Sequence, residues 1–254
     1  NNASCLGGGI TISGPNTVSI NNSTLSGNNA SHGGGIWSTN SGTLTINNST
    51  LSGNNAGYDG GGIRNSGGPM TISNSTIIDN SARDGGGIYN TGTLAVNNST
   101  LSGNTASASG GAIINGTNSM TINNSTIVDN SASAGSSGID NSATLEIKNS
   151  IVANDPTQSN CLNTGIFTAY GDNLDTDGTC VALSANFTTS VGINLQPLVG
   201  NGGPTLTHAL GVGSSAIDAA TDCTLVDGVT TVTEDQRGVT RPQGTACDVG
   251  AYEY

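Results

Sequence analysis

Two carboxylates occupy matching places in neighbouring repeats of the sequence and could perform acid–base chemistry. Asp59 and Asp84 each stand just before a run of glycines, so a repeating fold would bring them near one another. A glycoside hydrolase needs two such carboxylates at one site, whereas a polyuronate lyase needs a cationic base, for which only Arg64 and Arg83 are comparably placed. Copying of one repeat explains the aligned acids more simply, so we expect no enzyme.

A second candidate chemistry is calcium binding. The segment from Asn173 through Asp175 and Asp177 to Gly178 places three oxygen-bearing side chains at alternate positions before a glycine, as in the first part of a calcium loop. The glutamate that closes an EF-hand would fall at Ser184, which excludes that version. The pattern predicts either a calcium site or an acidic turn, and the sequence predicts no other cofactor.

Two further residue classes could mark surface chemistry. Asn115 and Asn186 stand in Asn-x-Ser/Thr triplets and are candidate glycan acceptors. Hydroxyl residues recur between apolar strand positions, and a flat array of this kind could bind ice; its members are Thr17, Ser19, Thr43, Thr45, Thr71, Thr93, Ser119, Thr121 and Thr144. Threonine is also a favoured exposed strand residue, and Pro69, Ala95 and Glu146 interrupt the array.

Composition excludes several classes of partner. Lysine and arginine number 5 against 17 acids, for a net charge of −12. Nucleic acids and anionic membranes attract clustered cations, so neither is an expected partner. No stretch approaches the roughly 18 to 20 apolar residues that cross a bilayer, so no transmembrane segment is expected.

The elements that must position these residues belong to a repeat. Isoleucines spaced 25 to 27 residues apart follow glycine-rich runs, at Ile10, Ile36, Ile63, Ile88, Ile113 and Ile139. Two further apolar rows follow in each unit: a period-two pair such as Leu44 and Ile46, and a row at Leu25, Leu51, Ile77, Leu101, Ile127 and Ile151. Self-similarity at this period indicates a solenoid, and alternation indicates strands.

Three short strands per unit, separated by Gly and Asn turns, predict an all-β fold: a single-stranded parallel β-helix of about six regular coils over residues 1–154. Columns of isoleucine, leucine and alanine would fill a narrow interior. Asparagines would stack at two corners, in the rows Asn22, Asn48, Asn74, Asn98 and Asn124, and Asn28, Asn54, Asn80, Asn104 and Asn130. Stacked amides can hydrogen-bond to one another and to freed backbone groups.

The repeat dissolves after Asn154. Residues 155–254 should form irregular terminal coils and a cap, because an uncovered coil exposes apolar columns and unpaired strands. Disulfides Cys161–Cys180 and Cys223–Cys247 are expected to staple this region. Cysteines paired in this way, without the close spacing of metal motifs, favour an oxidising, extracellular setting.

Two sets of motifs resemble known families. The Gly-Gly-Gly-Ile units followed by Leu/Ile-x-x-Asn look like the repeats of polymorphic outer-membrane proteins. The tail, from Asn-Gly-Gly-Pro-Thr at 201–205 through Asp235-Gln-Arg-Gly to Cys247-Asp-Val-Gly-Ala-Tyr-Glu, resembles the closing region of bacterial β-helix proteins of the choice-of-anchor type. The resemblance implies a right-handed coil, bacterial secretion or surface display, and no catalytic residues.

The first residues predict self-assembly. Asn1 and Asn2 correspond to Asn28 and Asn29 within a repeat, so an open first coil could pair head-to-tail with another copy, locked by Cys5. The expected function is therefore a non-enzymatic structural or adhesive surface protein, with itself or other surface proteins and glycans as partners. A polysaccharide-degrading enzyme and an ice-binding protein are the alternatives.

Overall fold

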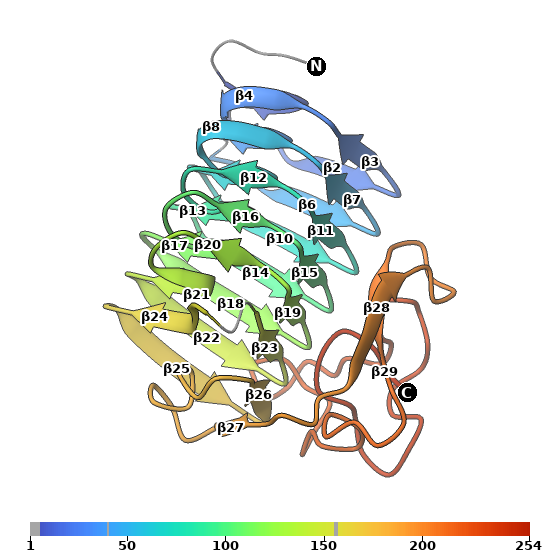
Figure 1. Ribbon diagram of the computed structural model, residues 1–254. Helices are drawn as coiled ribbons and strands as arrows, with labels where there is room; N and C mark the ends of the chain where they lie inside the picture. Colours follow the sequence, from blue (N-terminus) through green and yellow to red (C-terminus); the bar gives the residue numbers. More distant parts are fainter. Residues whose placement is uncertain (1–5, 40, 155–156) are drawn as a thin grey trace.

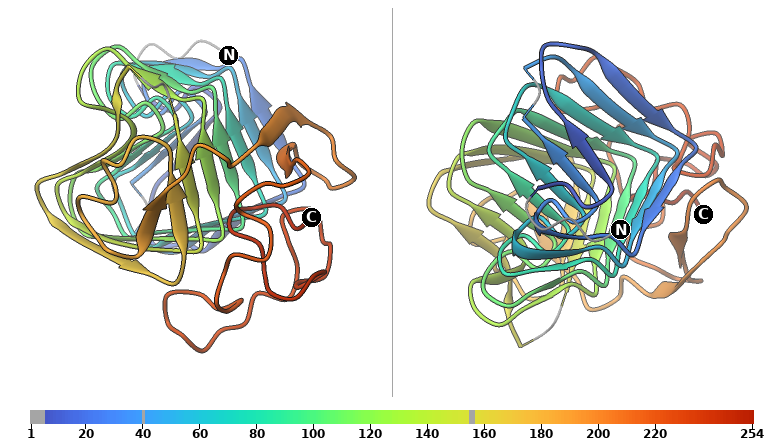
Figure 2. Two further views of the ribbon diagram at one scale, coloured as in Figure 1. Left: turned by 60° about the horizontal axis from the view of Figure 1, so that its bottom comes forward. Right: turned by 90° about the horizontal axis from the view of Figure 1, so that it is seen from above.

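The computed structural model describes residues 6–39, 41–154 and 157–254, and its coils stack into a parallel β-solenoid (Figure 1). Seen from above, successive coils repeat a similar outline with a stepwise offset (Figure 2). Four sheets result because strands at equivalent places in successive coils pair in parallel. The predicted all-β parallel coil is confirmed, but five of its coils contain a fourth short strand where three were expected, because residues around the alanine column also pair between coils.

Sheets I and II form two of the faces. Sheet I contains β1 (Ile10–Ile12), β5 (Ile36–Ser38), β9 (Ile63–Asn65), β13 (Ile88–Asn90), β17 (Ile113–Asn115), β21 (Ser136–Asn141) and β24 (Ser159–Asn163). Sheet II contains β2 (Val18–Asn21), β6 (Leu44–Asn47), β10 (Met70–Ser73), β14 (Leu94–Asn97), β18 (Ser119–Asn123), β22 (Thr144–Lys148) and β25 (Ile166–Tyr170).

Sheets III and IV complete the coil. Sheet III contains β3 (Thr24–Ser26), β7 (Thr50–Ser52), β11 (Thr76–Ile78), β15 (Thr100–Ser102), β19 (Thr126–Val128), β23 (Ile151–Ala153), β26 (Asn173–Asp175) and β27 (Phe187–Thr189). Sheet IV contains β4 (Asn29–His32), β8 (Asn55–Asp59), β12 (Ser81–Ala82), β16 (Thr105–Ala106) and β20 (Ser131–Ala132). An antiparallel hairpin of β28 (Leu195–Val199) and β29 (Thr207–Leu210) lies outside the coil.

The core is built from vertical columns of identical or similar side chains. Ile36 pairs in register with Ile63, Ile63 with Ile88, and the column continues through Ile113 and Ile139, all fully buried. Each strand alternates between inward apolar and outward polar residues, so little apolar surface is needed per coil. The predicted register is therefore confirmed for this row.

One row differs from the prediction at its last member. Val152, not Ile151, pairs with Ile127 and enters the core. Ile151 pairs with Thr126, because both residues follow an Asn-Ser pair and therefore occupy the same outward position. Its side chain packs instead against the C-terminal segment.

Stacked asparagine amides run through the interior beside the apolar columns. Along the row Asn28, Asn54, Asn80, Asn104, Asn130 and Asn154, each Nδ2 donates to the next Oδ1 at 2.8–2.9 Å. A second ladder, which we did not predict, joins Asn65, Asn90, Asn115, Asn141 and Asn163 at 2.6–2.9 Å. Both ladders satisfy buried amides in a core with few apolar side chains.

The coil continues beyond residue 154, where we expected the regular repeats to end. β24, β25 and β26 add a further coil in the same sheets. Val181, Leu183 and Phe187 then pack under the apolar column and close this end. The predicted Cys161–Cys180 disulfide is formed and ties this closing segment to β24.

Residues 190–254, which we call the flank, do not cap the coil as expected. They lie along its side, against the outer face of sheet III (Figures 1 and 2). Thr76 Oγ1 donates to Leu206 O at 2.7 Å, Thr100 Oγ1 donates to Gln236 Oε1 at 2.6 Å, and Ala251 N donates to Thr126 Oγ1 at 3.0 Å. The outward hydroxyl column of sheet III supplies this docking surface.

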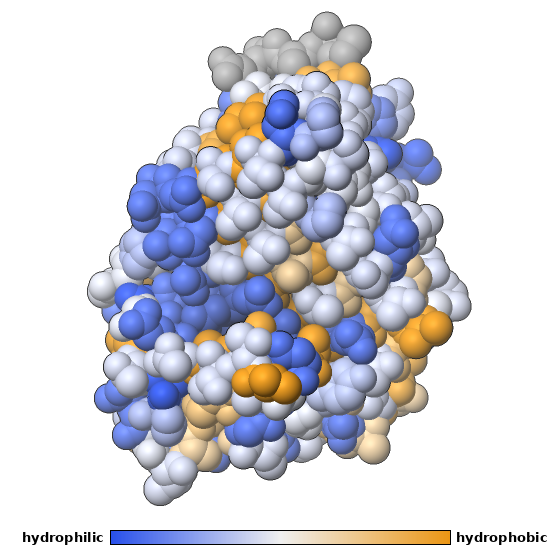
Figure 3. Space-filling model, turned by 180° about the vertical axis from the view of Figure 1, so that it is seen from behind, coloured by the Kyte–Doolittle hydropathy of each residue, from blue (hydrophilic) through white to orange (hydrophobic). Residues whose placement is uncertain are grey.

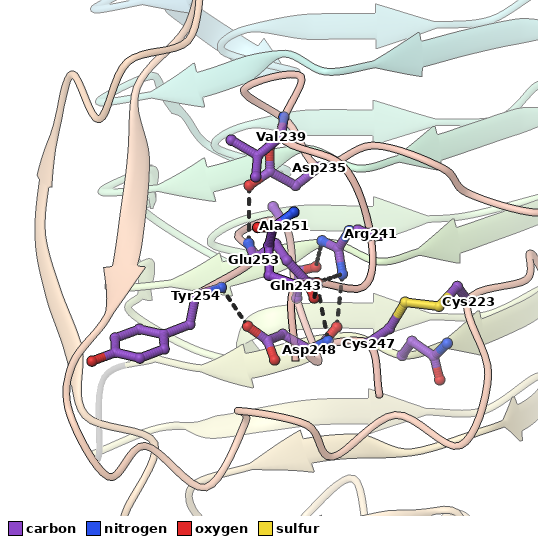
Figure 4. Close-up of polar contacts among 12 residues, drawn as sticks. Cys223, Asp235, Val239, Arg241, Gln243, Cys247, Asp248, Ala251, Glu253 and Tyr254 are labelled. Carbon is purple, nitrogen blue, oxygen red and sulfur yellow. Dashed lines mark hydrogen bonds and ion pairs between the residues drawn. A yellow bond between two sulfur atoms is a disulfide. The ribbon is translucent and has the colours of Figure 1, made fainter. Parts of the chain in front are cut away.

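Buried ions hold the flank together (Figure 4). The Arg241 guanidinium pairs with Glu253 at 3.1 Å and donates to the carbonyls of Asp248 and Gly250 at 2.8 and 2.6 Å. The Glu253 carboxylate accepts backbone N–H groups from Gln243 and Asp248 at 3.0 and 3.1 Å. Burial raises the pKa of the Glu253 carboxyl, although these hydrogen bonds and the Arg241 charge act to lower it. The predicted Cys223–Cys247 disulfide is formed and lies beside the cluster.

Candidate functional site

Each coil bends sharply at a glycine that lies between the residues before its glycine run and its strand in sheet I. These bends stack into a column. At Gly60 the backbone φ is +68°, and a Cβ atom there would lie 2.3 Å from Ile63 O. Glycine alone tolerates this combination. Gly33, Gly85 and Gly110 repeat the bend in neighbouring coils with φ between +60° and +66°. The bend is concave outward, because the missing Cβ at Gly33 would meet Trp37 Cβ at 2.8 Å.

Outward side chains therefore face one another across this bend, and we call the result the glycine corner. One wall is the in-register column His32, Asp59 and Asp84. The other wall is the outward column of sheet I, which reads Thr11, Trp37, Arg64, Tyr89, Ile114, Asp140 and Leu162. Trp37, Arg64 and Tyr89 lie on adjacent strands.

Contacts across the corner form one connected cluster. Asp59 Oδ2 lies 2.9 Å from His32 Nδ1 and also pairs with the Arg64 guanidinium. Arg64 Cζ lies 5.1 Å from the centroid of the Tyr89 ring, within cation–π range. The His32 ring stacks on Tyr58, with centroids 5.1 Å apart.

Burial and the Arg64 charge lower the pKa of His32. This lowering favours the neutral imidazole, and Nδ1 is the ring nitrogen that faces the Asp59 carboxylate. Burial also lowers the pKa of Arg64. Asp59 thus accepts from two basic side chains at once. A hollow of about 350 Å³ lies at the first described coil, lined by Leu6, Ser31, His32 and Tyr58.

The two aligned carboxylates do not form a free acid–base pair. Asp59 is committed to His32 and Arg64, and Asp84 lies 3.7 Å from Arg83 Nε. A glycosidase needs one carboxylic acid free to protonate the leaving oxygen and one free base or nucleophile. In this arrangement Asp59 is already paired with two basic side chains and Asp84 lies near one.

Comparison with known proteins agrees with the architecture. A family model described as the right-handed beta helix region matches residues 8–181, more than half of the chain. The chain belongs to the right-handed β-helix family. No curated protein and no solved structure matches it.

The β-helix concentrates its chemically distinctive residues at the glycine corner. All three aromatic residues of 6–154, at Trp37, Tyr58 and Tyr89, lie on it. Copying a repeat yields like residues at like positions, as in the inward isoleucine column. The corner column instead changes at every coil. Sequence reasoning named these residues singly and missed the cluster, although the signal, an irregular position beside an invariant isoleucine, was present.

One corner residue carries an unused donor. Trp37 Nε1 is buried and has no hydrogen-bond partner among the described residues. Buried donors in native proteins are nearly always paired.

The β-helix uses the predicted calcium ligands for its own turns. Asn173 Oδ1 accepts from Ser150 N at 3.0 Å, and Asp175 Oδ2 accepts from Cys180 N at 2.9 Å. Asp177 accepts from Thr179 N and Asn160 N. Across 6–39, 41–154 and 157–254, no group of three or more His, Cys, Asp or Glu side chains is placed to hold a metal ion.

The two glycan candidates have different environments. Asn115 is fully buried and donates to Asn141 Oδ1 at 2.7 Å within the second amide ladder. A glycan cannot be attached there in the folded chain, so this prediction is wrong. Asn186 is exposed, although its Nδ2 donates to Ala169 O at 2.7 Å, and it stays a prediction.

The residues predicted to mediate self-assembly, Asn1, Asn2 and Cys5, lie outside the described part of the chain. The opposite end of the coil is described and is covered by Val181, Leu183 and Phe187. Continuous head-to-tail stacking of coils would require this closing segment to move. No helix among the described residues is long and apolar enough to cross a membrane.

Ser102 and His208 form a pair with nucleophile–base geometry away from the corner. Ser102 Oγ lies 3.0 Å from His208 Nε2, and His208 Nδ1 lies 2.7 Å from Gln196 O. Both residues are about 5% exposed or less because the flank covers them. Burial lowers the pKa of His208. The pair joins the flank to sheet III, and a substrate cannot reach it in this arrangement.

The predicted threonine array lies on the outer face of sheet II. Ser19, Thr45, Thr71, Ala95 and Thr121 form one vertical column by strand register, followed by Glu146. Seen from behind, the surface is pale over much of its area, as expected for serine, threonine and glycine, with strongly hydrophilic patches along one side (Figure 3).

Proposed function

We propose that this β-helix is a secreted or surface-displayed, non-enzymatic adhesive module that binds its ligand at the glycine corner. The observation that carries the proposal is that Trp37, Arg64 and Tyr89 lie on adjacent strands of sheet I with their side chains outward, beside the charged side chains of the other wall. Rigid aromatic rings beside charged groups are typical of recognition surfaces.

An extracellular location fits the two disulfides, which persist in oxidising compartments. The rigid coil also suits an adhesin, because sites built on strands are held more accurately than sites on loops. The resemblance of the repeats and tail to bacterial surface proteins supports bacterial surface display.

Binding of the purified chain to arrays of glycans and extracellular proteins tests the proposal. The variants Trp37→Ala and Tyr89→Ala should lose binding, whereas Tyr170→Ala, which removes an exposed aromatic ring on sheet II, should keep it. Equal binding by all three variants would overturn the site. Release of new reducing ends from any bound polysaccharide would overturn the non-enzymatic assignment.

Ice binding at sheet II is a second candidate, supported by the register that aligns Thr45, Thr71 and Thr121. It predicts thermal hysteresis that disappears in Thr45→Tyr and Thr121→Tyr and persists in Trp37→Ala. Absence of hysteresis in the unaltered protein would exclude it.

A further inference from the structure

We propose that the Asn201–Gly202 pair is a site of spontaneous deamidation, and that its conversion loosens the β28–β29 hairpin from the coil. The hairpin belongs to the flank, which docks on sheet III, so the inference does not depend on the binding proposed at the glycine corner. It follows from the sequence of the turn, the free space around Gly202 and the contacts of the Asn201 amide.

Deamidation needs only an asparagine, the peptide nitrogen that follows it, and water. The Gly202 nitrogen attacks Cγ of Asn201 and loses its proton to solvent, and the side-chain amide leaves as ammonia. Water then opens the resulting succinimide ring at either carbonyl, which yields aspartate or isoaspartate. Glycine favours the attack, because no Cβ shields its nitrogen or restricts the backbone.

The chain contains two Asn-Gly pairs, and the fold protects the pair at Asn115. This asparagine is fully buried in the second amide ladder, where its Nδ2 donates to Asn141 Oδ1 at 2.7 Å. The nitrogen that would attack it, Gly116 N, donates to Asn90 O at 2.8 Å. Neither group can turn toward the other while the coil is intact.

The other pair lies in the turn between β28 and β29. Gly202 is exposed, and a Cβ atom there would meet no heavy atom within 4 Å beyond its own chain neighbours. No described residue accepts a hydrogen bond from Gly202 N. The nitrogen is therefore free to approach the Asn201 side chain, as is common at exposed turns of small residues.

The Asn201 amide closes the hairpin. Its Nδ2 donates to Thr207 O at 2.9 Å and to Thr207 Oγ1 at 3.0 Å. These bonds restrain the side chain, so the reaction is slower in the folded protein than in the unfolded chain. An ionised aspartate only accepts hydrogen bonds, so after conversion a carboxylate oxygen faces the Thr207 carbonyl. Thr207 is fully buried, and such repulsion is strong away from water.

Thr207 stands between the residues that fasten the hairpin to sheet III. Before it, Leu206 O accepts from Thr76 Oγ1 at 2.7 Å, and after it, His208 Nε2 lies 3.0 Å from Ser102 Oγ. Both contacts depend on the position of this segment, so displacement of Thr207 weakens them together. Isoaspartate adds to the displacement, because it places Cβ in the main chain and lengthens the turn. Deamidation thus loosens the hairpin slowly and irreversibly.

Peptide mapping by mass spectrometry tests the site. The full chain is incubated at physiological temperature, at neutral and at mildly alkaline pH, with and without urea. In the native protein we expect Asn201 to convert while Asn115 stays unchanged, and conversion to be faster at the higher pH because Gly202 N must give up its proton. In urea both asparagines should convert at similar rates. Conversion of Asn201 only in urea, or equal conversion of both asparagines in the native protein, would overturn the proposal.

The variant Asn201→Asp tests the structural consequence. Hydrogen exchange in β28 and β29 should accelerate severalfold and stay slow in β13 and β17. Asn55→Asp adds the same charge at an exposed asparagine of sheet IV and should leave exchange in the hairpin unchanged. The unaltered protein after conversion gives the same measurement if Asn201→Asp fails to fold. Equal exchange in the hairpin with and without conversion would refute the loosening.

Discussion

The coil and the flank solve the same shortage of apolar side chains in opposite ways. The coil is almost free of buried charge and relies on repetition, because apolar side chains and asparagine amides stack on similar or identical neighbours in the coils above and below. The flank has no repeat, and it buries Asp235, Arg241, Asp248 and Glu253 in one connected cluster. A repeat can satisfy its polar groups with copies of themselves, whereas an irregular segment needs complementary charges and a disulfide.

The strongest test of this difference removes the central cation of the flank. In Arg241→Met the Glu253 carboxylate loses its buried partner, which should destabilise the flank by about 3–5 kcal/mol. Hydrogen exchange should accelerate in β28, β29 and residues 235–253 and stay slow in β13 and β17. Arg83→Met, which removes an exposed pair with Asp84, is the matched control. Unfolding of the coil together with the flank would refute their independence.

The amide ladder allows the reciprocal test in the coil. In Asn104→Ala, the Nδ2 and backbone N–H of Asn80 lose their common acceptor. An unsatisfied buried group costs about 1–3 kcal/mol, so we expect a lower unfolding midpoint in denaturant. Asn55→Ala, an exposed asparagine on sheet IV, should change it little. Similar losses in both variants would show that the ladder is not a special source of stability.

Acid should loosen the contact between the two regions. Burial lowers the pKa of His208, so as pH falls below about 6.5 the unfolded chain takes up a proton before the folded one does. The stability contributed by neutral His208 is present above this pH and is lost as the pH falls toward the folded pKa. Chemical denaturation from pH 7.5 to 5 should show a shallower pH dependence in His208→Gln. Identical slopes would contradict a buried neutral imidazole.

The smallest effect on stability is expected at the corner. Tyr89 is half-buried on the outer face of sheet I, and surface substitutions of this kind change stability by about 0.5 kcal/mol. Thermal unfolding of Tyr89→Ala should therefore match the unaltered protein even though ligand binding is lost. A large drop in unfolding temperature would assign the column a structural role.

Repetition made the coil predictable and left the rest open. Ile36, Ile63 and Ile88 recur after 25 to 27 residues, each directly following a run of glycines, so their register could be predicted without knowledge of the turns. The corner could not be predicted, because it depends on the concave direction of the bend at Gly60, which brings Asp59 to Arg64. The position of the flank depends on contacts such as Gln236 with Thr76, 160 residues apart, and no local pattern specifies such a pair.

The contact of the flank along the side of the coil fixes the number of coils that lie beside it. It touches Thr76, Thr100 and Thr126 in turn, and Asn149 O accepts from Gly250 N at 2.9 Å. An extra coil inserted between two of these contacts would shift the contacts on one side of it by one inter-strand spacing, about 4.8 Å, and break them. A coil added on the side of Thr76 that faces β4 would leave all of these contacts in place. The molecule can therefore be lengthened at the end nearest β4, while the number of coils beside the flank stays fixed.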